Sequence, residues 1–384
     1  MGETRRWRAV VVAAVAGLLM PATAVTAASA SEPLHLVAPT GPHQVGATEL
    51  YLKDTSRADP WVPEQNAREL MVTLWYPTRA RHGTATEYLS AGESRLMVEG
   101  KRLTGVDPEI FSTVRTYAFV DAPPAGRRHS LPLIVLSPGY TQPRATLSAL
   151  AEDLASHGYV VAGVDHTYET HAITFPDGRV TGCAACEQDG ERPFFGKLYQ
   201  SRAADVSFVI DRLTGRDPAW RGSRLIDASR IGMSGHSAGG ASAIAAMVRD
   251  PRIDAGIDMD GTTDTGGDSM IPAAGLARPF LLFGSPDHAS GGRDAWWDKD
   301  WAGMTGWKRW ITVAGTEHAS FTDLGLFADQ LGIDIGATTP GIRATEITRR
   351  YNRAMFDKHL RHRPQAILNA ASPRFPEVAI VARS

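Results

Sequence analysis

Runs of consecutive apolar residues alternate along this chain with segments in which apolar residues recur at helical spacing. A short continuous apolar run predicts a strand buried on both faces, and such strands are expected at 70–77, 131–136, 158–165, 230–234, 255–259, 279–284 and 310–314. Helical spacing predicts helices at 145–157, 201–213, 241–248 and 345–359. The region 79–128 reads as irregular. Together these elements predict an α/β protein with a mostly parallel central sheet, helices on both faces, and functional sites at the carboxyl ends of the strands.

The pentapeptide Gly235-His236-Ser237-Ala238-Gly239 lies between a predicted strand and a predicted helix. In such a turn the serine takes a strained backbone conformation that exposes its hydroxyl, and only small residues two positions before and after it avoid a clash. Gly235 and Gly239 meet that demand. The alternative is a glycine-rich loop in which Ser237 merely caps the helix. The strand and helix on either side favour Ser237 as a nucleophile.

A serine nucleophile needs a histidine base, and the base needs a carboxylate that fixes its tautomer. His318 follows the last predicted strand, where this architecture returns a histidine to the serine. His166 follows an earlier strand at the same sheet edge, but it precedes Ser237, against the expected order of serine, acid and histidine. Asp260 and Asp287 each follow a strand between Ser237 and His318, and the pattern alone does not separate them.

Ester and amide chemistry at a serine also needs two N–H donors for the carbonyl oxygen as it gains charge. One donor is the amide of the residue after the nucleophile, which is Ala238 here. The other is expected in the turn after the strand 131–136, where the amide of Tyr140 is the best candidate. No cofactor is required by this chemistry. The aspartates at 258, 264 and 268 do not have the spacing of a calcium loop, so no metal site is predicted.

Charge and length narrow the class of protein. The chain has 384 residues and a formal net charge of −2, which becomes −4 once the first thirty residues, with three Arg and one Glu, are set aside. No dense stripe of Lys and Arg is present, which argues against a nucleic-acid partner. Residues 31–384 are expected to form one large catalytic domain.

Five tryptophans crowd the stretch before His318, and such clusters are more often core than binding surface.

The N-terminus and the cysteines indicate export. Residues 1–30 combine an arginine-rich start, an apolar stretch and a small-x-small ending, which predicts a secretory signal peptide of the general secretory or the twin-arginine type. A membrane anchor is less favoured because the apolar stretch is short and is broken by Pro21. The only cysteines, Cys183 and Cys186, lie in a loop-like stretch, and a local disulfide is expected for them in a secreted protein.

Four sequence blocks together resemble the type II platelet-activating-factor acetylhydrolase family of the α/β-hydrolase superfamily, which is close to secreted bacterial lipases and polyester hydrolases. The blocks are LSPGY at 136–140, DLASHGYVV at 153–161, GHSAGG at 235–240 and GTEHASF at 315–321. The resemblance implies Asp260 as the acid and the amides of Tyr140 and Ala238 as oxyanion donors. The polyester hydrolases take their acid from the later strand, which keeps Asp287 as the alternative. Pro138 stands where the family often has a histidine, and Ala238 stands where the family often has a bulky residue.

The resemblance also implies a secreted serine esterase acting on short-acyl lipid or phospholipid-like esters, without a cofactor and in transient contact with a lipid surface. A broader lipase or polyester hydrolase is the second expectation, and a peptidase is the third. A binding protein that kept the scaffold without catalysis is the alternative from another class, because a fold does not fix a function. The complete set of serine, acid and histidine argues against it. Nothing in the sequence indicates the oligomeric state.

Overall fold

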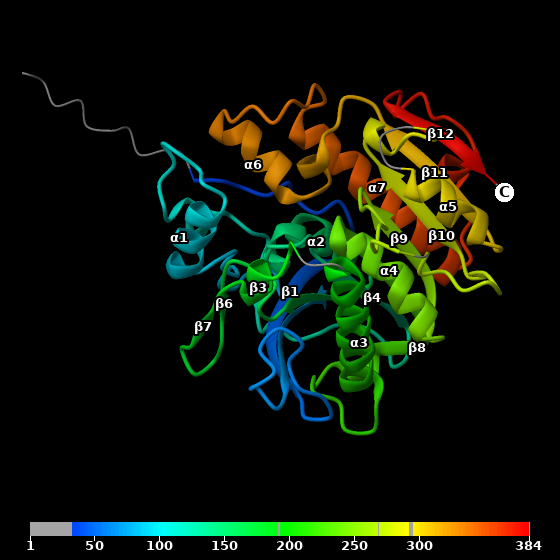
Figure 1. Cartoon of the computed structure of the whole chain (residues 1–384). Coiled ribbons are helices and arrows are strands. Elements are labelled where there is room, and N and C mark those ends of the chain that lie inside the picture. The colour runs from blue at the N-terminus through cyan, green and yellow to red at the C-terminus, as the bar shows by residue number, and fades with distance from the viewer. Residues whose placement is uncertain (1–32, 191–192, 268, 292–294, 384) are drawn as a thin grey trace, which may run out of the picture. The chain divides into compact units, whose positions relative to one another are not determined.

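The computed structural model describes residues 33–383 apart from 191–192, 268 and 292–294, and a large central sheet dominates these ranges (Figure 1). The strands of this sheet are β1 (Gln44–Asp54), β2 (Arg68–Thr78), β3 (Ala118–Val120), β4 (Leu131–Ser137), β5 (Val160–His166), β8 (Ile226–His236), β9 (Ile253–Met259), β10 (Phe280–Gly284), β11 (Lys308–Val313) and β12 (Val378–Arg383). A separate small hairpin joins β6 (Ile173–Thr174) and β7 (Val180–Thr181). The predicted signal peptide at 1–30 lies outside the described residues.

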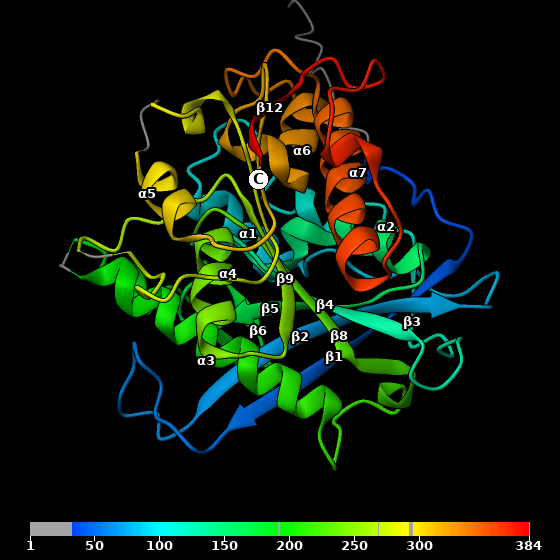
Figure 2. The same ribbon diagram turned by 90° about the vertical axis from the view of Figure 1, so that its right-hand side faces the viewer.

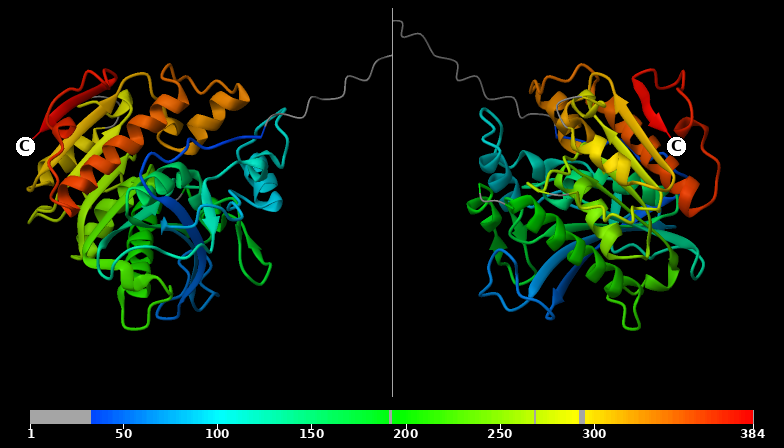
Figure 3. Two further views of the ribbon diagram at one scale, coloured as in Figure 1. Left: turned by 180° about the vertical axis from the view of Figure 1, so that it is seen from behind. Right: turned by 45° about the vertical axis from the view of Figure 1, so that its right-hand side comes forward.

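The strands lie in the order β12-β11-β10-β9-β8-β4-β5-β2-β1-β3. From β11 to β5 every neighbouring pair is parallel. Antiparallel pairs occur toward the two ends, where β12 pairs with β11 and where β2 pairs with both β5 and β1. In both views of Figure 3 the C-terminal strand, in red, lies at one end of the sheet and β1, in blue, lies toward the other. The prediction of a mostly parallel central sheet is confirmed.

Helices cover both faces of this sheet (Figure 2). The helices are α1 (Ala91–Gly100), α2 (Ser148–Ser156), α3 (Phe194–Thr214), α4 (Ala238–Arg249), α5 (Trp296–Gly303), α6 (Asp323–Leu331) and α7 (Gly341–Leu360). Apolar residues of α3 and α4 pack with Leu133 and Val135 in one core cluster. Those of α2 and α7 pack with Ile134 and Leu136 in another. Successive residues of a strand point to opposite faces, which explains why the continuous apolar run of β4 serves both clusters.

Each strand expected from an apolar run is present, although several boundaries shift by a few residues. The prediction that the whole region 79–128 is irregular is wrong, because α1 and β3 lie within it. The strands β1 and β12 were not predicted either. In β1 exposed and buried positions mix along the strand, as expected of a strand near a sheet end, so no continuous apolar run marks it. Within the described ranges, no helix has the length and apolar character needed to cross a membrane.

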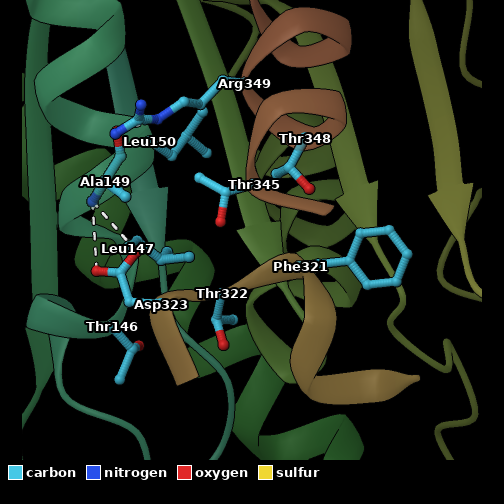
Figure 4. Close-up of a pocket in the computed structure, with 10 residues that line it drawn as sticks. All are labelled: Thr146, Leu147, Ala149, Leu150, Phe321, Thr322, Asp323, Thr345, Thr348 and Arg349. Carbon is cyan, nitrogen blue, oxygen red and sulfur yellow. Dashed lines mark hydrogen bonds between the residues drawn. The ribbon is translucent and has the colours of Figure 1, made fainter. Parts of the chain in front are cut away.

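A polar junction ties α2 to α6 and α7 on one face of the sheet (Figure 4). The Ala149 N–H donates to the carboxylate of Asp323 at 3.2 Å, and the Arg349 Nε–H donates to the Ala149 carbonyl at 2.8 Å. These three residues line a cavity of about 10 Å³. The backbone groups at the start of α2 are therefore satisfied by side chains from the last third of the chain.

We expect the buried carboxyl of Glu152 on α2 to make the stability of the fold depend on pH. Burial raises the pKa of Glu152 to about 7, although the N–H groups of Tyr117 and Ala118 and the charge of Arg349 act to lower it. In the unfolded chain this carboxyl titrates near 4.5. Between these two values the folded protein keeps a proton that the unfolded chain has released, so stability falls as pH rises through this window.

The variant Glu152→Gln keeps an acceptor oxygen for both amides but does not ionise. Its free energy of unfolding should match that of the wild type near about pH 4 and exceed it by about 2 to 3 kcal/mol near about pH 8. Urea unfolding of the two proteins at both pH values measures this difference. A difference that is the same at both pH values would contradict the expectation.

Candidate active site

Ser237 lies in the turn between β8 and α4. Its backbone has φ of 55° and ψ of −126°, a region that residues other than glycine rarely adopt. A Cβ on Gly235 would come within 2.2 Å of the Gly239 backbone, and a Cβ on Gly239 would come within 2.0 Å of the Ser137 oxygen. The two glycines therefore allow the strand, the helix and the loop after β4 to meet closely around Ser237, whose side chain is half-buried.

Asp260 and His318 form a hydrogen-bonded pair at this turn. His318 Nδ1 lies 2.6 Å from Asp260 Oδ2. Asp260 directly follows β9, and the Ser237 N–H donates to the carbonyl of the preceding residue, Met259, at 2.8 Å. His318 begins the short helical turn His318–Phe321 after β11. The Asp260 side chain is 2% exposed and that of His318 is 56% exposed, so the carboxylate is shielded from solvent and the imidazole is accessible to a substrate.

Asp260 remains ionised in this environment. Burial acts to raise the pKa of its carboxyl, but the hydrogen bond from His318 and the nearby ring of His288 lower the pKa to about 2. The Ser285 N–H also donates to Asp260 Oδ1 at 2.6 Å. An ionised Asp260 accepts the Nδ1–H of His318, and this orientation of the ring leaves Nε2 as the nitrogen that faces away from Asp260.

His236 holds the segment that carries His318. Its Nε2–H donates to the His318 carbonyl at 2.8 Å, and the two rings lie 4.5 Å apart between centroids. Burial and the neighbouring charge of His318 lower the pKa of His236 to about 3, so this ring stays neutral. The motif pattern gave no role to this residue, because its second position accepts many residue types.

The two residues expected to supply the oxyanion donors, Ala238 and Tyr140, belong to segments that adjoin Ser237. Ala238 begins α4, and within the described part of the chain neither its amide nor that of Tyr140 donates to a protein acceptor. A Cβ on Gly139 would lie 3.4 Å from the Ser237 Cβ, so the loop after β4 runs close beside the serine. Neither amide is thus used by another protein group, and the loop that carries Tyr140 lies next to Ser237.

The rival residues are placed elsewhere. Asp287 lies exposed in the turn after β10, and the neighbouring His288 is the residue whose Nε2 approaches Asp260 Oδ1, at 3.7 Å. His166 is buried, and its ring nitrogens lie 2.9 Å from Ser137 Oγ and 2.7 Å from an oxygen of Asp205. The structure thus brings Asp260, rather than Asp287, to His318, and it places His166 in a separate buried contact with Ser137 and Asp205.

Two of the five tryptophans before His318 belong to the core. Trp297 and Trp310 are buried, and their indole N–H groups donate to the carbonyls of Gly261 and His288 at 2.7 and 2.8 Å. Trp297 also stacks on His288 with ring centroids 4.3 Å apart. These rings support the side of the site that carries Asp260.

A different aromatic group stands beside the loop after β4. The Tyr140 ring meets Phe194 and Phe195 edge to face, with centroids 5.4 and 6.3 Å apart. The expected disulfide between Cys183 and Cys186 is present, and Cys183 Sγ lies 3.8 Å from the Tyr140 hydroxyl. The sequence gave no signal for this group, because Tyr140, the two phenylalanines and the disulfide come from three separate segments.

The double variant Cys183→Ser, Cys186→Ser should unfold about 2 kcal/mol more easily than the wild type. The disulfide spans only 3 positions, and so short a loop restricts the unfolded chain little. Urea unfolding measures the change, and reduction of the wild type should reproduce it. An unfolding midpoint that neither treatment shifts would show that this disulfide does not stabilise the fold.

A larger cleft with a volume of about 640 Å³ lies over the sheet surface of β1 and β2 and is bordered by Pro143 and Arg144. Ser237, Asp260 and His318 are not among its lining residues. This cleft is therefore separate from the candidate active site.

Comparison with known proteins points to esterases. Residues 28–182 match a family model described as platelet-activating factor acetylhydrolase, isoform II. A probable 1-alkyl-2-acetylglycerophosphocholine esterase of Arthroderma benhamiae is 27% identical, over 96% of this chain and 99% of that protein. A bis(hydroxyethyl) terephthalate hydrolase of Streptomyces coelicolor is 28% identical over 38% of this chain and 43% of that protein. The solved structure of a ferulic acid esterase from Streptomyces cinnamoneus is 40% identical and superimposes with a TM-score of 0.81, covering 91% of this chain and 99% of that chain.

Proposed function

This chain belongs to the carboxylic ester hydrolases of the platelet-activating factor acetylhydrolase type, which have the α/β-hydrolase fold, and on this premise we propose that it works through Ser237, His318 and Asp260. One observation carries the assignment: a strained serine lies beside a shielded aspartate that is hydrogen-bonded to an accessible histidine. That arrangement supplies a nucleophile, a base and the group that orients the base.

In the proposed reaction the Ser237 Oγ attacks the ester carbonyl carbon while His318 Nε2 takes its proton. The oxygen that gains charge accepts hydrogen bonds from the amides of Ala238 and Tyr140. His318 then gives its proton to the departing alcohol, and an acyl group remains on Ser237. Water, activated by the same histidine, releases the acid and restores the serine. Asp260 stabilises the imidazolium in both halves of the cycle.

Short acyl groups on lipid or phospholipid-like esters are the first proposed substrates. The Arthroderma relative, named as an acetylglycerophosphocholine esterase, aligns over nearly the full length of both chains. The family model that matches residues 28–182 is also named for release of an acetyl group. Such substrates would bring the enzyme into transient contact with a lipid surface.

Esters of aromatic acids are the second proposed substrate class, and a specific feature favours them. Tyr140 and Phe195 are partly exposed and meet each other and the buried Phe194 ring edge to face, on and beside the loop that carries one oxyanion donor. Planar acyl groups pack well against such rings. Two relatives are named for aromatic acids, ferulic acid in one and terephthalate in the other. A polyester hydrolase would fall in this second class, whereas a broader lipase acting on longer acyl groups is a separate alternative.

We also propose that the enzyme is secreted as one catalytic domain, residues 31–384, after removal of the signal peptide. The disulfide between Cys183 and Cys186 supports this location, since such bonds persist in oxidising compartments. Analysis of the N-terminal residue of protein recovered from the culture medium tests it. A mature N-terminus near residue 31 is expected, and retention of the full chain inside the cell would contradict the proposal.

A substrate panel tests the proposed function. Hydrolysis rates are measured for p-nitrophenyl esters from acetate to palmitate, for methyl ferulate and for bis(hydroxyethyl) terephthalate, with Ser237→Ala beside the wild type. Preference for acetate or butyrate supports the first class, and a higher kcat/KM for the aromatic esters supports the second. Rates that rise with acyl length would favour a lipase. Equal rates in the wild type and Ser237→Ala would refute the mechanism.

A further inference from the structure

A second contact chain of serine, histidine and aspartate lies beneath the loop that carries Tyr140. Ser137 Oγ is 2.9 Å from His166 Nε2, and His166 Nδ1 is 2.7 Å from Asp205 Oδ2. The three side chains are fully buried or nearly so. Because Ser137 is 0% exposed, no ester carbonyl can reach its hydroxyl, so this chain is not a second nucleophilic site.

The charges around this buried chain set the direction of its hydrogen bonds. Burial acts to raise the pKa of Asp205, but Arg68, His166 and Arg57 lower it well below its usual range, and Arg68 Nη2 lies 2.8 Å from its carboxylate. Burial lowers the pKa of His166, so its ring is neutral. The ring therefore donates Nδ1–H to ionised Asp205 and accepts the Ser137 hydroxyl proton at Nε2.

Arg202 connects the contacts of Ser137, His166 and Asp205 to the start of the loop. Its Nη1 donates to the Pro138 carbonyl at 2.5 Å. The same nitrogen lies 3.4 Å from Ser137 Oγ, the oxygen that donates its proton to His166. The peptide unit between Pro138 and Gly139 is planar, so a fixed carbonyl also fixes the direction in which the chain enters the turn.

Glu169 connects the same arginine to the end of the loop. The Glu169 carboxylate accepts from Arg202 Nε at 2.7 Å, while its backbone carbonyl accepts from the Thr141 N–H at 2.9 Å. Thr141 has φ of 67°, a conformation that a residue of this type holds only when its surroundings impose it. Tyr140 thus lies between two anchored residues, Pro138 before it and Thr141 after it.

We propose that Ser137, His166 and Arg202 are positioning residues that keep the Tyr140 amide aimed at the oxyanion during ester hydrolysis. The inference rests on the proposed function, because Tyr140 matters only if an oxyanion forms at Ser237. Donors that are fixed in advance stabilise developing charge without reorganising at the moment of reaction. A loop freed from its anchors would still bind the ground-state ester but would present the N–H group less accurately.

A merely structural role for the buried chain predicts a different result. Loss of one buried hydroxyl would then lower the free energy of unfolding and leave kcat of the folded protein unchanged. A positioning role lowers kcat and weakens binding of a trifluoromethyl ketone, whose adduct with Ser237 places an oxyanion between the donors. KM, which reflects ground-state binding when acylation is slow, should stay nearly constant.

The test compares Ser137→Ala with the matched control Ser94→Ala. Ser94 is also fully buried and lies on α1, away from the site. Its hydroxyl donates to the Pro108 carbonyl at 2.7 Å. With p-nitrophenyl acetate, we expect Ser137→Ala to lose about 10- to 100-fold in kcat and a similar factor in ketone affinity, with KM within about twofold. Ser94→Ala should keep all three values within about twofold. Wild-type kcat and ketone affinity in folded Ser137→Ala would overturn the proposal.

Two replacements of His166 give a second test should Ser137→Ala fail to fold. Glutamine places a carbonyl near the Nε2 position and can still accept from Ser137, whereas asparagine reaches only the Nδ1 position beside Asp205. His166→Gln should therefore retain more kcat and ketone affinity than His166→Asn, and the reverse order would overturn the proposal.

If Ser237→Ala abolishes activity while the Ser137 and His166 variants match the wild type, the positioning role alone fails. If the wild type and Ser237→Ala are equally inactive, both proposals fail.

Discussion

Replacement of Ser237 by alanine should lower kcat for p-nitrophenyl acetate by about four to six orders of magnitude. Without the hydroxyl no acyl-enzyme can form, and only the oxyanion donors and substrate binding remain to assist attack by water. Removal of a strained serine hydroxyl does not open the core, so the free energy of unfolding should change little. Steady-state kinetics and urea unfolding measure the two effects.

Ser242→Ala is the matched control for this variant. Ser242 lies on the same helix, α4, where its hydroxyl donates to the Ala238 carbonyl at 2.6 Å without facing a substrate. Its kcat should stay within about threefold of the wild type. A Ser237→Ala protein that is folded and retains a tenth or more of wild-type activity would exclude Ser237 as the nucleophile.

Replacement of Asp260 by asparagine should lower kcat by about 10⁴-fold, whereas Asp287→Asn should change it by less than about threefold. The asparagine can turn its NH₂ group toward His318 Nδ1, which then becomes an acceptor. The proton moves to Nε2, where the ring can no longer accept one from Ser237. The same substrate and steady-state assay measure both variants.

The two aspartates therefore act as controls for each other. Both follow a strand, both lie between Ser237 and His318 in the chain, and both substitutions exchange one oxygen for an NH₂ group. A large loss of kcat in Asp287→Asn together with near-normal Asp260→Asn would move the acid to the later strand, as in the polyester hydrolases that the sequence resembles.

The sequence identified the centre of the fold better than its ends. Strands such as β4 and β9 are buried on both faces and therefore appear as apolar runs. The strand β1 lies near one end of the sheet, where exposed and buried positions mix. The short helix α1 was missed because its apolar residues, including Met97 and Val98, pack in a small separate cluster with segments distant in the sequence.

The site shows the same limit for polar contacts. Order along the chain pointed to Ser237 and His318, but left Asp260 and Asp287 equivalent, because both end a parallel strand at the same sheet edge. Their difference is one of direction: Asp260 has φ of 58° and faces His318, while Asp287 lies exposed in the following turn. The contact of His166 with Ser137 and Asp205 depends on three segments meeting, for which neither spacing nor composition gives a signal.

The acyl-enzyme itself offers the most direct test of the mechanism. The wild type is mixed with p-nitrophenyl acetate, quenched in acid during turnover, digested and analysed by mass spectrometry. We predict one acetyl group on the peptide that contains Ser237, with fragmentation placing it on that residue, and none in Ser237→Ala. Continued turnover with the acetyl group on another residue, or with no acetylated peptide in either protein, would contradict catalysis through Ser237.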